Sequence, residues 1–338
     1  MARILIYSTT FPPNVGGLET ISFLIARELA RLGHEVTVFT PAASKERDVT
    51  PFLIVRSRSW WTFLRTWRKA QVVLYFNVSL KGIWPLLIVR RPVVISHHGP
   101  YRRPSGKLGL RDWIKYRLAS HFENIAVSGF VAQSLEGKVT VVPNAYDNEL
   151  FRLKNEIERN YDFVFVGRLV NDKGADDFIK ALARIIRNPP VTASVVGDGP
   201  FRRELEELVR DLELQDRVTF CGIQTGEALV DAVNRHRILV VPSQFQEPFG
   251  IVALEGIACG CIVIGSQGGG LTDAIGPCGM TYPIRDVGAL SAAMREILDG
   301  GEKNGAYYKN FHAHLAIHKP AAVAQQYEKV LIKSCREA

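Results

Sequence analysis

The chain has 338 residues, 47% of them hydrophobic and 22% charged, which suits about two globular domains and excludes an extended disordered protein. Five cysteines without zinc-type spacing exclude a disulfide framework or zinc module, and we expect reduced, mostly buried thiols in a reducing cytoplasm. No secretory signal and no apolar run of roughly 18 residues are present, so we expect a soluble or peripheral protein, and its net charge of +8 suggests an anionic partner.

Short apolar runs that predict strands alternate with helical patterns along the whole chain. The runs are residues 4–8, 36–40, 52–55, 72–76, 93–96, 125–127, 139–142, 163–166, 193–196, 218–220, 238–241 and 261–265. Most are uniformly apolar rather than alternating, which is typical of strands buried on both faces of a parallel sheet. About twelve strands are too many for one open sheet, so we predict two α/β domains that meet in the polar stretch 147–161.

The loop after the first strand, F-P-P-N-V-G-G at 11–17, leads into a helical pattern. Gly16 and Gly17 would let the backbone approach a ligand and expose helix N–H groups to an anion, although a tight strand-to-helix turn explains the same pair. No G-x-G-x-x-G fingerprint follows a strand with an acid about 20 residues on. The sequence therefore argues against a nicotinamide-dependent dehydrogenase.

A basic, aromatic-rich stretch follows at residues 56–117, which hold 14 basic residues and one acidic residue, Asp112. A helix over 60–67 would place four apolar side chains on one face: Trp60, Phe63, Leu64 and Trp67. Arg65, Arg68 and Lys69 would lie off that face. Two interpretations remain open at this point, a helix packed on the sheet of the first domain and a helix that binds a membrane surface or an acceptor.

The loops after two strands of the second half carry charges and glycines. Gly167 is followed by Arg168 and, five residues further on, by Lys173, and both cations could reach a diphosphate, although paired surface cations are common. Gly197 ends the next strand and would permit close ligand approach, while Asp198 would act as a helix N-cap.

The segment 241–255 is the most specific one. Pro248 disfavours helical geometry at Glu247, so Glu247 belongs to the loop and the helix begins at about Phe249. Glu255 then lies about two turns inside the helix. Carboxylates accept paired hydrogen bonds from vicinal hydroxyl groups, and the N–H groups at Gly250 and beyond suit phosphate or hydroxyl oxygens.

Taken in order, these segments resemble the retaining glycosyltransferases of family 4, which have the GT-B fold. The matching motifs are P-P-N-x-G-G at 12–17, G-R-L-x-x-x-K-G at 167–174, V-G-D-G-P at 196–200 and E-P-F-G-x-x-x-x-E at 247–255. The resemblance covers nearly the whole chain. It implies two facing Rossmann-like domains with parallel sheets, at 1–150 on the acceptor side and at 151–318 on the nucleotide-sugar side. A C-terminal helix at 319–338 would return to the first domain.

The resemblance also implies roles for individual residues. Arg168 and Lys173 would hold the donor diphosphate, Glu247 the sugar hydroxyls and Glu255 the ribose. The first domain would contribute Gly16, Gly17 and a histidine after its fifth strand, for which His98 matches better than His97. The remaining positions expected in the donor site are Gly167, Gly197, Phe249, Gly250 and Ile251. The sequence departs from the family at 271–273, where many relatives carry Pro and Glu.

The implied reaction takes place on one face of the sugar, with Arg168, Lys173 and helix dipoles stabilising the leaving diphosphate. We therefore expect no cofactor and no metal, and no Asp-x-Asp motif occurs. The expected partners are a UDP-sugar or GDP-mannose donor, a glycan or lipid-linked acceptor of cell-envelope or polysaccharide biosynthesis, and an anionic membrane surface bound through 56–117 on the inner face of the cytoplasmic membrane. A GT-B-like sugar-nucleotide epimerase is the alternative, and no nucleic-acid-binding module is present.

Overall fold

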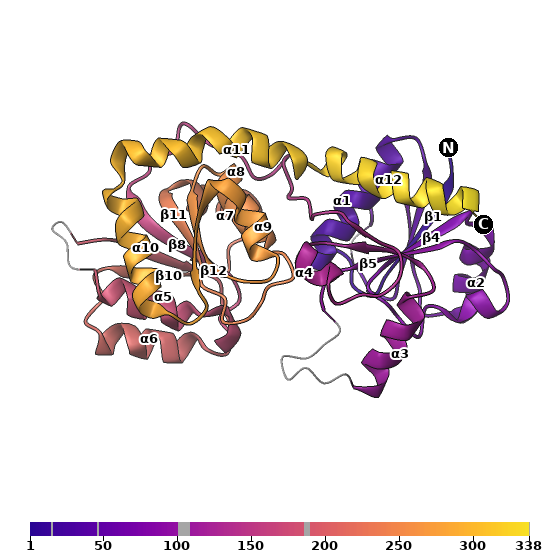
Figure 1. Cartoon of the computed structure of the whole chain (residues 1–338), viewed down its shortest axis with the longest axis horizontal. Helices are drawn as coiled ribbons and strands as arrows, with labels where there is room; N and C mark the ends of the chain where they lie inside the picture. The colour runs from indigo at the N-terminus through magenta and orange to yellow at the C-terminus, as the bar shows by residue number, and fades with distance from the viewer. Residues whose placement is uncertain (15, 46, 101–108, 186–189, 338) are drawn as a thin grey trace. The chain divides into compact units, whose positions relative to one another are not determined.

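The computed structural model describes residues 1–14, 16–45, 47–100, 109–185 and 190–337 of the chain (Figure 1). The chain divides into two compact units, unit 1 with Met1–Ala145 and His318–Ala338, and unit 2 with Tyr146–Ile317. The predicted domain limits were residues 150 and 318. Of the basic stretch 56–117, residues 101–108 and the side chain of Arg111 lie outside the described part.

Unit 1 contains a parallel sheet of seven strands in the order β3-β2-β1-β4-β5-β6-β7. The strands are β1 (Arg3–Ser8), β2 (Glu35–Thr40), β3 (Leu53–Arg56), β4 (Val72–Phe76), β5 (Val93–His97), β6 (Glu123–Ala126) and β7 (Val139–Val141). The helices are α1 (Gly17–Arg31), α2 (Trp60–Lys69), α3 (Leu110–Ala119), α4 (Gly129–Ala132), α12 (Pro320–Glu337) and the 3₁₀ helix η1 (Trp84–Leu87).

Both faces of this sheet are covered, as the uniformly apolar strands predict. Ile4 and Ile6 of β1 belong to a core shared with α1 and α12. Leu5 and Tyr7, whose side chains alternate with these, belong to a second core shared with α2. Within unit 1 the last helix of the chain therefore completes the first domain, which confirms the predicted return of the C-terminal helix (Figure 1).

Unit 2 contains a parallel sheet of six strands in the order β10-β9-β8-β11-β12-β13. The strands are β8 (Tyr161–Val166), β9 (Ala193–Val196), β10 (Val218–Gly222), β11 (His236–Val241), β12 (Ile262–Gln267) and β13 (Gly279–Pro283). The helices are α5 (Ala175–Ala183), α6 (Arg202–Asp211), α7 (Gly226–Asn234), α8 (Ile251–Ala258), α9 (Leu271–Ile275), α10 (Val287–Asp299) and α11 (Gly305–Ile317), with the 3₁₀ helices η2 (Asn171–Lys173), η3 (Gly276–Cys278) and η4 (Gly301–Asn304). The predicted parallel α/β architecture with two sheets is confirmed.

Each sheet has one point at which the strand order reverses, between β1 and β4 in unit 1 and between β8 and β11 in unit 2. In open parallel sheets, ligands bind at the carboxyl ends of the strands that flank such a point. The two loops with the most specific sequence signals, 167–174 and 242–250, follow β8 and β11. The topology therefore brings both loops to the switch point of unit 2.

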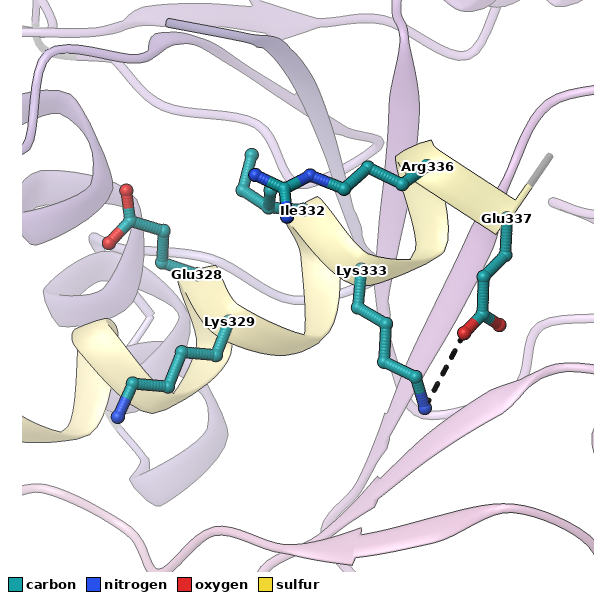
Figure 2. Close-up of a pocket in the computed structure, with 6 residues that line it drawn as sticks. All are labelled: Glu328, Lys329, Ile332, Lys333, Arg336 and Glu337. Carbon is teal, nitrogen blue, oxygen red and sulfur yellow. Dashed lines mark ion pairs between the residues drawn. The ribbon is translucent and has the colours of Figure 1, made fainter.

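The outer face of α12 carries a shallow hollow of about 470 Å³ that is lined by charged side chains (Figure 2). Lys333 and Glu337 form an ion pair of 3.9 Å on this face, and Lys138 contacts the same glutamate at 3.2 Å. Nearby, His34 Nε2 donates a hydrogen bond of 2.8 Å to the Glu328 carboxylate. These contacts tie the helix to unit 1, so the hollow is a solvated, charge-paired helix surface.

Candidate functional site

Lys173 and Glu247, which are 74 residues apart in the chain, meet at the switch point of unit 2. The Lys173 Nζ lies 2.6 Å from Glu247 Oε1, and the Ser243 hydroxyl donates a hydrogen bond of 2.7 Å to the same oxygen. Glu247 is only 8% exposed, whereas Lys173 is half-buried. The second carboxylate oxygen, Oε2, has no hydrogen-bond partner among the residues that the structure describes. The arrangement thus fixes a carboxylate in place and leaves one of its acceptor oxygens available.

Close backbone packing holds the two loops together. Gly174 has a φ of +70°, and a side chain there would collide with the carbonyl of Pro242. The Gln244 N–H donates to the Asp172 carbonyl at 2.8 Å, and the Gln244 side-chain amide donates to Asp176 and to Asp177. The loop after β11 is therefore anchored on the start of α5, beside the Lys173 side chain.

Arg168 lies in the same loop as Lys173 but has a different environment. Its side chain is exposed and makes no ion pair or hydrogen bond with any described residue. Gly167 precedes it and packs against Gly197, whose φ of +139° and contact with the Gly167 carbonyl leave no room for a side chain. An unpaired guanidinium group at a sheet edge is free to bind an anion, as a diphosphate requires.

Asp198 does not cap the following helix, contrary to the prediction. The N-cap residue of α6 is Phe201, which makes no side-chain cap. Asp198 instead accepts from the Gly199 N–H at 2.7 Å and pairs with Arg202 at 3.3 Å. The loop after β9 turns back on Leu169, and this moves the helix start beyond the reach of Asp198.

The helix after Glu247 begins at Ile251 rather than at Phe249, so Glu255 lies just over one turn inside α8, not two. Gly250, with a φ of +100°, is the N-cap residue. The N–H groups of the first turn are therefore offered from Ile251 onward. Phe249 as a whole residue, main chain included, is 2% exposed and therefore presents almost no surface to a ligand.

Glu255 is a partly buried carboxyl group without a hydrogen bond or ion pair to any described residue. Burial, reinforced by the nearby Asp147 carboxylate, raises the pKa of Glu255 to about 7. Its surroundings include Val166, Leu239 and Val252, which line a small void beside it. Hydrogen bonds from hydroxyl groups would stabilise a desolvated acceptor of this kind.

In unit 1, the candidate histidine follows β5 directly. The His98 side chain is partly exposed, its ring lies 5.3 Å from the Phe76 ring, and its main-chain N–H donates to the Asn77 side chain at 2.8 Å. Burial and the neighbouring His97 lower the pKa of His98 to about 3. His97 itself is fully buried and contacts Asn124 at 2.7 Å, which makes it part of the core and His98 the available one.

Gly16 and Gly17 lie at the start of α1, after β1. A side chain at position 16 would meet the carboxylate of Glu19, which stands beside the first turn. A carboxylate already lies where the sequence predicted an exposed, anion-binding helix start. This place therefore suits a hydroxyl group better than a phosphate.

Several residues of these clusters carried no signal in the sequence. Ser243 holds the Glu247 carboxylate, and the ring of Phe245 lies 5.1 Å below the Lys173 ammonium group. Asn77 has a positive φ of 64° and orients the main chain of His98. Only the packed fold brings these side chains to their partners, although Ser243 and Phe245 do belong to the segment that the sequence singled out.

Two features are absent from the described ranges. In those ranges, no three His, Cys, Asp or Glu side chains are grouped so that they could hold a metal ion. None of the helices placed there has both the length and the apolar character of a membrane-spanning segment.

Solved structures with this architecture are numerous. Sucrose-phosphate synthase from Thermosynechococcus elongatus superposes with a TM-score of 0.84 at 22% identity, over 100% of both chains. Anabaena HepE in complex with UDP-glucose superposes with a TM-score of 0.83 at 20% identity, over 98% of this chain and 100% of HepE. At these identities the likeness establishes the fold, which is GT-B.

The sequence relatives are glycosyltransferases. The phosphatidylinositol N-acetylglucosaminyltransferase gpi3 subunit of Schizosaccharomyces pombe is 26% identical over 98% of this chain and 80% of its own length. The D-inositol 3-phosphate glycosyltransferase of Frankia alni is 28% identical over 84% of this chain and 86% of its own. Residues 15–150 match the model of glycosyltransferase family 4, and residues 147–313 match that of glycosyl transferases group 1. The chain therefore belongs to the family 4 glycosyltransferases.

Proposed function

We propose that this glycosyltransferase moves a hexosyl unit, with retention of configuration, from a nucleotide sugar bound by unit 2 to a glycan or lipid-linked acceptor bound by unit 1. The carbon–oxygen bond between the anomeric carbon and the β-phosphate breaks, and a bond from the same carbon to the acceptor oxygen forms. The acceptor proton passes to the leaving diphosphate. Polysaccharide or cell-envelope biosynthesis is the process that such a transfer would serve.

The observation that carries this proposal is the cluster at the switch point of unit 2. Arg168 is unpaired and exposed among the described residues, Lys173 of the same loop is held by Glu247, and Glu247 keeps one free carboxylate oxygen. We assign Arg168 and Lys173 to the diphosphate and the free oxygen of Glu247 to the sugar hydroxyls. We assign the glycine and helix-start positions at 167, 197, 250 and 251 to the same donor site, and Glu255 to hydrogen bonds from the ribose.

We further propose that the two cations, rather than a metal ion, supply the positive charge that the leaving diphosphate needs. Preorganised charge of this kind stabilises a transition state without reorganisation. Arg168→Ala and Lys173→Ala should each weaken binding of free UDP or GDP about tenfold or more in calorimetry, with or without EDTA. Unchanged affinity in both variants would contradict the assignment, and strict dependence of turnover on an added metal would contradict the charge argument.

The donor is proposed to be a UDP-sugar or GDP-mannose. Relatives named as N-acetylglucosaminyltransferases and a structural neighbour bound to UDP-glucose support testing UDP-sugars first. The decisive measurement is hydrolysis of a panel of UDP-, GDP- and ADP-sugars, with Glu247→Gln as the variant expected to have low activity. Release of nucleoside diphosphate from one donor supports the transfer. Epimerised nucleotide sugar without any diphosphate release would establish the epimerase alternative instead.

We also propose that unit 1 docks on an anionic membrane surface, which would place the enzyme at the inner face of the cytoplasmic membrane. Trp60 and Trp61 are 51% and 57% exposed and stack on each other at 3.7 Å, and Leu87 is 89% exposed in the neighbouring η1. Trp84 of η1 contacts Trp60 edge-on at 5.9 Å, so the two exposed apolar groups adjoin. The basic side chains around them supply the charge that anionic headgroups attract.

A further inference from the structure

Ser96, the penultimate residue of β5, connects His98 to the last helix of the chain. Its hydroxyl oxygen lies 2.9 Å from His98 Nε2 and 2.7 Å from the Tyr327 hydroxyl of α12. Ser96 and Tyr327 are both 0% exposed, and the Tyr327 ring stacks on Phe76 at 6.3 Å. All these residues belong to unit 1, so the chain of hydrogen bonds lies within one compact body.

The direction of these hydrogen bonds follows from the donors and acceptors that Tyr327, Ser96 and His98 provide. Burial raises the pKa of Tyr327, so its phenol keeps its proton, and the Ser96 oxygen is the acceptor within its reach in the described part of the chain. If Tyr327 donates to Ser96, the Ser96 proton is directed to His98 Nε2. The opposite direction would leave the Tyr327 hydroxyl buried without an acceptor, at a cost of about 1–3 kcal/mol.

We propose that Tyr327 acts through Ser96 as a positioning residue that fixes His98 as the tautomer with its proton on Nδ1. In this tautomer Nε2 accepts from Ser96, and Nδ1–H is a neutral donor aimed away from the core contact. The ring nitrogen Nδ1 makes no hydrogen bond to a described residue. Resting on the proposed function, we assign this N–H to an oxygen of the bound substrate, a sugar hydroxyl or an acceptor oxygen.

The surroundings of the ring support this assignment. The tilted contact of the His98 ring with the Phe76 ring holds the ring, and the hydrogen bond from the His98 main chain to Asn77 holds the backbone. The depressed pKa of His98 means that the imidazole is neutral near pH 7, so the tautomer matters rather than the charge. With Nε2 occupied and Nδ1 protonated, His98 donates a hydrogen bond and has no free nitrogen for general base catalysis. The last helix is therefore part of the functional machinery.

The first test reads the tautomer without any substrate. A long-range ¹H–¹⁵N correlation spectrum of the full chain, labelled at its histidines, distinguishes protonated from unprotonated ring nitrogens, and His98→Asn assigns the signals. The wild type should show the Nδ1–H form alone, and Tyr327→Phe should add a population of the Nε2–H form, because the Ser96 hydroxyl then loses its bond from Tyr327. Circular dichroism would verify that the variant is folded. An Nε2–H tautomer in the wild type, or a spectrum unchanged by Tyr327→Phe, overturns the proposal.

The second test concerns the substrate. The amide nitrogen of Asn occupies the place of Nδ1, and that of Gln occupies the place of Nε2. His98→Asn should therefore retain at least tenfold more kcat/KM than His98→Gln. Equal losses would overturn the substrate contact at Nδ1–H. The spectrum tests the tautomer even if the enzyme proves inactive on every donor tried, so failure of the proposed function and failure of this inference are distinguishable.

Discussion

The environment of Glu247 illustrates how one carboxylate is held for binding. An oxygen that receives both an ammonium group and a hydroxyl group is no longer a good nucleophile, while its partner oxygen still accepts hydrogen bonds from a sugar. We expect Glu247→Gln to lower kcat/KM by roughly two orders of magnitude, about 3 kcal/mol, because a preorganised ionic acceptor becomes a neutral amide. Steady-state kinetics on the donor identified by the panel would measure this loss.

The matched control for this prediction is Glu206→Gln, which breaks a surface ion pair with Arg202 at 2.8 Å in the same unit. An exposed pair of this kind contributes little, so the control should leave turnover within about twofold. A folded Glu247→Gln variant with nearly normal kcat/KM would remove Glu247 from the mechanism.

The raised pKa of Glu255 makes the free energy of unfolding depend on pH. The carboxyl group titrates near pH 7 in the folded chain and near 4.5 when unfolded, so the folded state holds the extra proton between these values. The protonated form favours folding below about pH 4.5, and this contribution is lost as the pH rises through 7. Glu255→Gln removes the titration and should raise the free energy of unfolding at pH 8 by about 1–3 kcal/mol relative to the wild type.

Urea unfolding at pH 8 and again at pH 5 would measure this effect. The difference between Glu255→Gln and the wild type should shrink at pH 5, where both side chains are neutral in the folded state. A difference that does not depend on pH would show that the carboxyl group is not desolvated as described. Binding of a nucleoside diphosphate should weaken in the variant, because an amide accepts ribose hydrogen bonds less strongly than a carboxylate.

At the scale of elements, all twelve strands predicted from the apolar runs are present in the structure, mostly with ends within two residues of the predicted ones. Strands buried on both faces of a parallel sheet have a strong local signal, so this part of the fold was readable. The strand β13, with sequence G-M-T-Y-P at the edge of its sheet, was missed because its glycine, threonine and proline give no apolar run. Edge strands tolerate such residues, since one side of the backbone is unpaired.

The helix α2 shows what a periodic pattern leaves open. Phe63, Leu64 and Trp67 are buried on the sheet, so the interpretation as a packed helix holds for them. Trp60 and Trp61 at its first turn are exposed. Helical spacing alone does not tell how far along the helix the covered face extends.

The loop between β8 and α5 provides a test of element packing. Gly174→Ala introduces both a strained left-handed φ and a collision with the Pro242 carbonyl, whereas Gly226→Ala has a similar φ of +57° with open space around it. We expect Gly226→Ala to cost about 1–2 kcal/mol and Gly174→Ala about 3 kcal/mol or more. Only the latter should also weaken nucleotide binding, because it displaces Lys173.

Thermal unfolding and calorimetric titration with UDP and GDP would compare the two glycine variants. The difference between them isolates the collision from the backbone strain. If both variants lose the same stability and bind nucleotide equally well, then the contact between the loops after β8 and β11 does not position the Lys173 side chain.

At the scale of the whole molecule, the resemblance of ordered motifs predicted the family and the two-sheet architecture, because each motif lies at the end of a parallel strand. The contacts that give the site its chemistry join positions far apart in the chain, as Lys173 with Glu247 and Ser96 with Tyr327 do. Such pairs depend on side-chain packing in three dimensions. Pattern and spacing therefore predicted the loops that meet at the switch point of unit 2, while the contacts between their side chains required the structure.

The charge distribution of the whole chain leads to the last prediction. Unit 1 carries the exposed apolar pair Trp60 and Trp61, together with Arg58, Arg65 and Lys81, whose side chains are exposed and form no ion pair in the described ranges. Each basic residue near an anionic surface contributes about 1 kcal/mol, and salt screens this over about 10 Å. Inserted aromatic rings add a contribution that salt does not remove.

Sedimentation with vesicles of phosphatidylcholine alone, or mixed with an anionic lipid, would test this docking. Wild-type protein should bind the anionic vesicles, less so at high salt, and should ignore the neutral ones. The change of Arg58, Arg65 and Lys81 to Gln should abolish most of the salt-sensitive part, and Trp60→Ser with Trp61→Ser most of the rest. The matched control, Arg210, Lys303 and Lys309 of unit 2 changed to Gln, removes the same charge from another surface and should bind like the wild type. If wild-type protein stays in solution with anionic vesicles at low salt, or if both triple variants lose binding equally, the docking surface of unit 1 does not exist, and its basic excess then serves a soluble anionic partner.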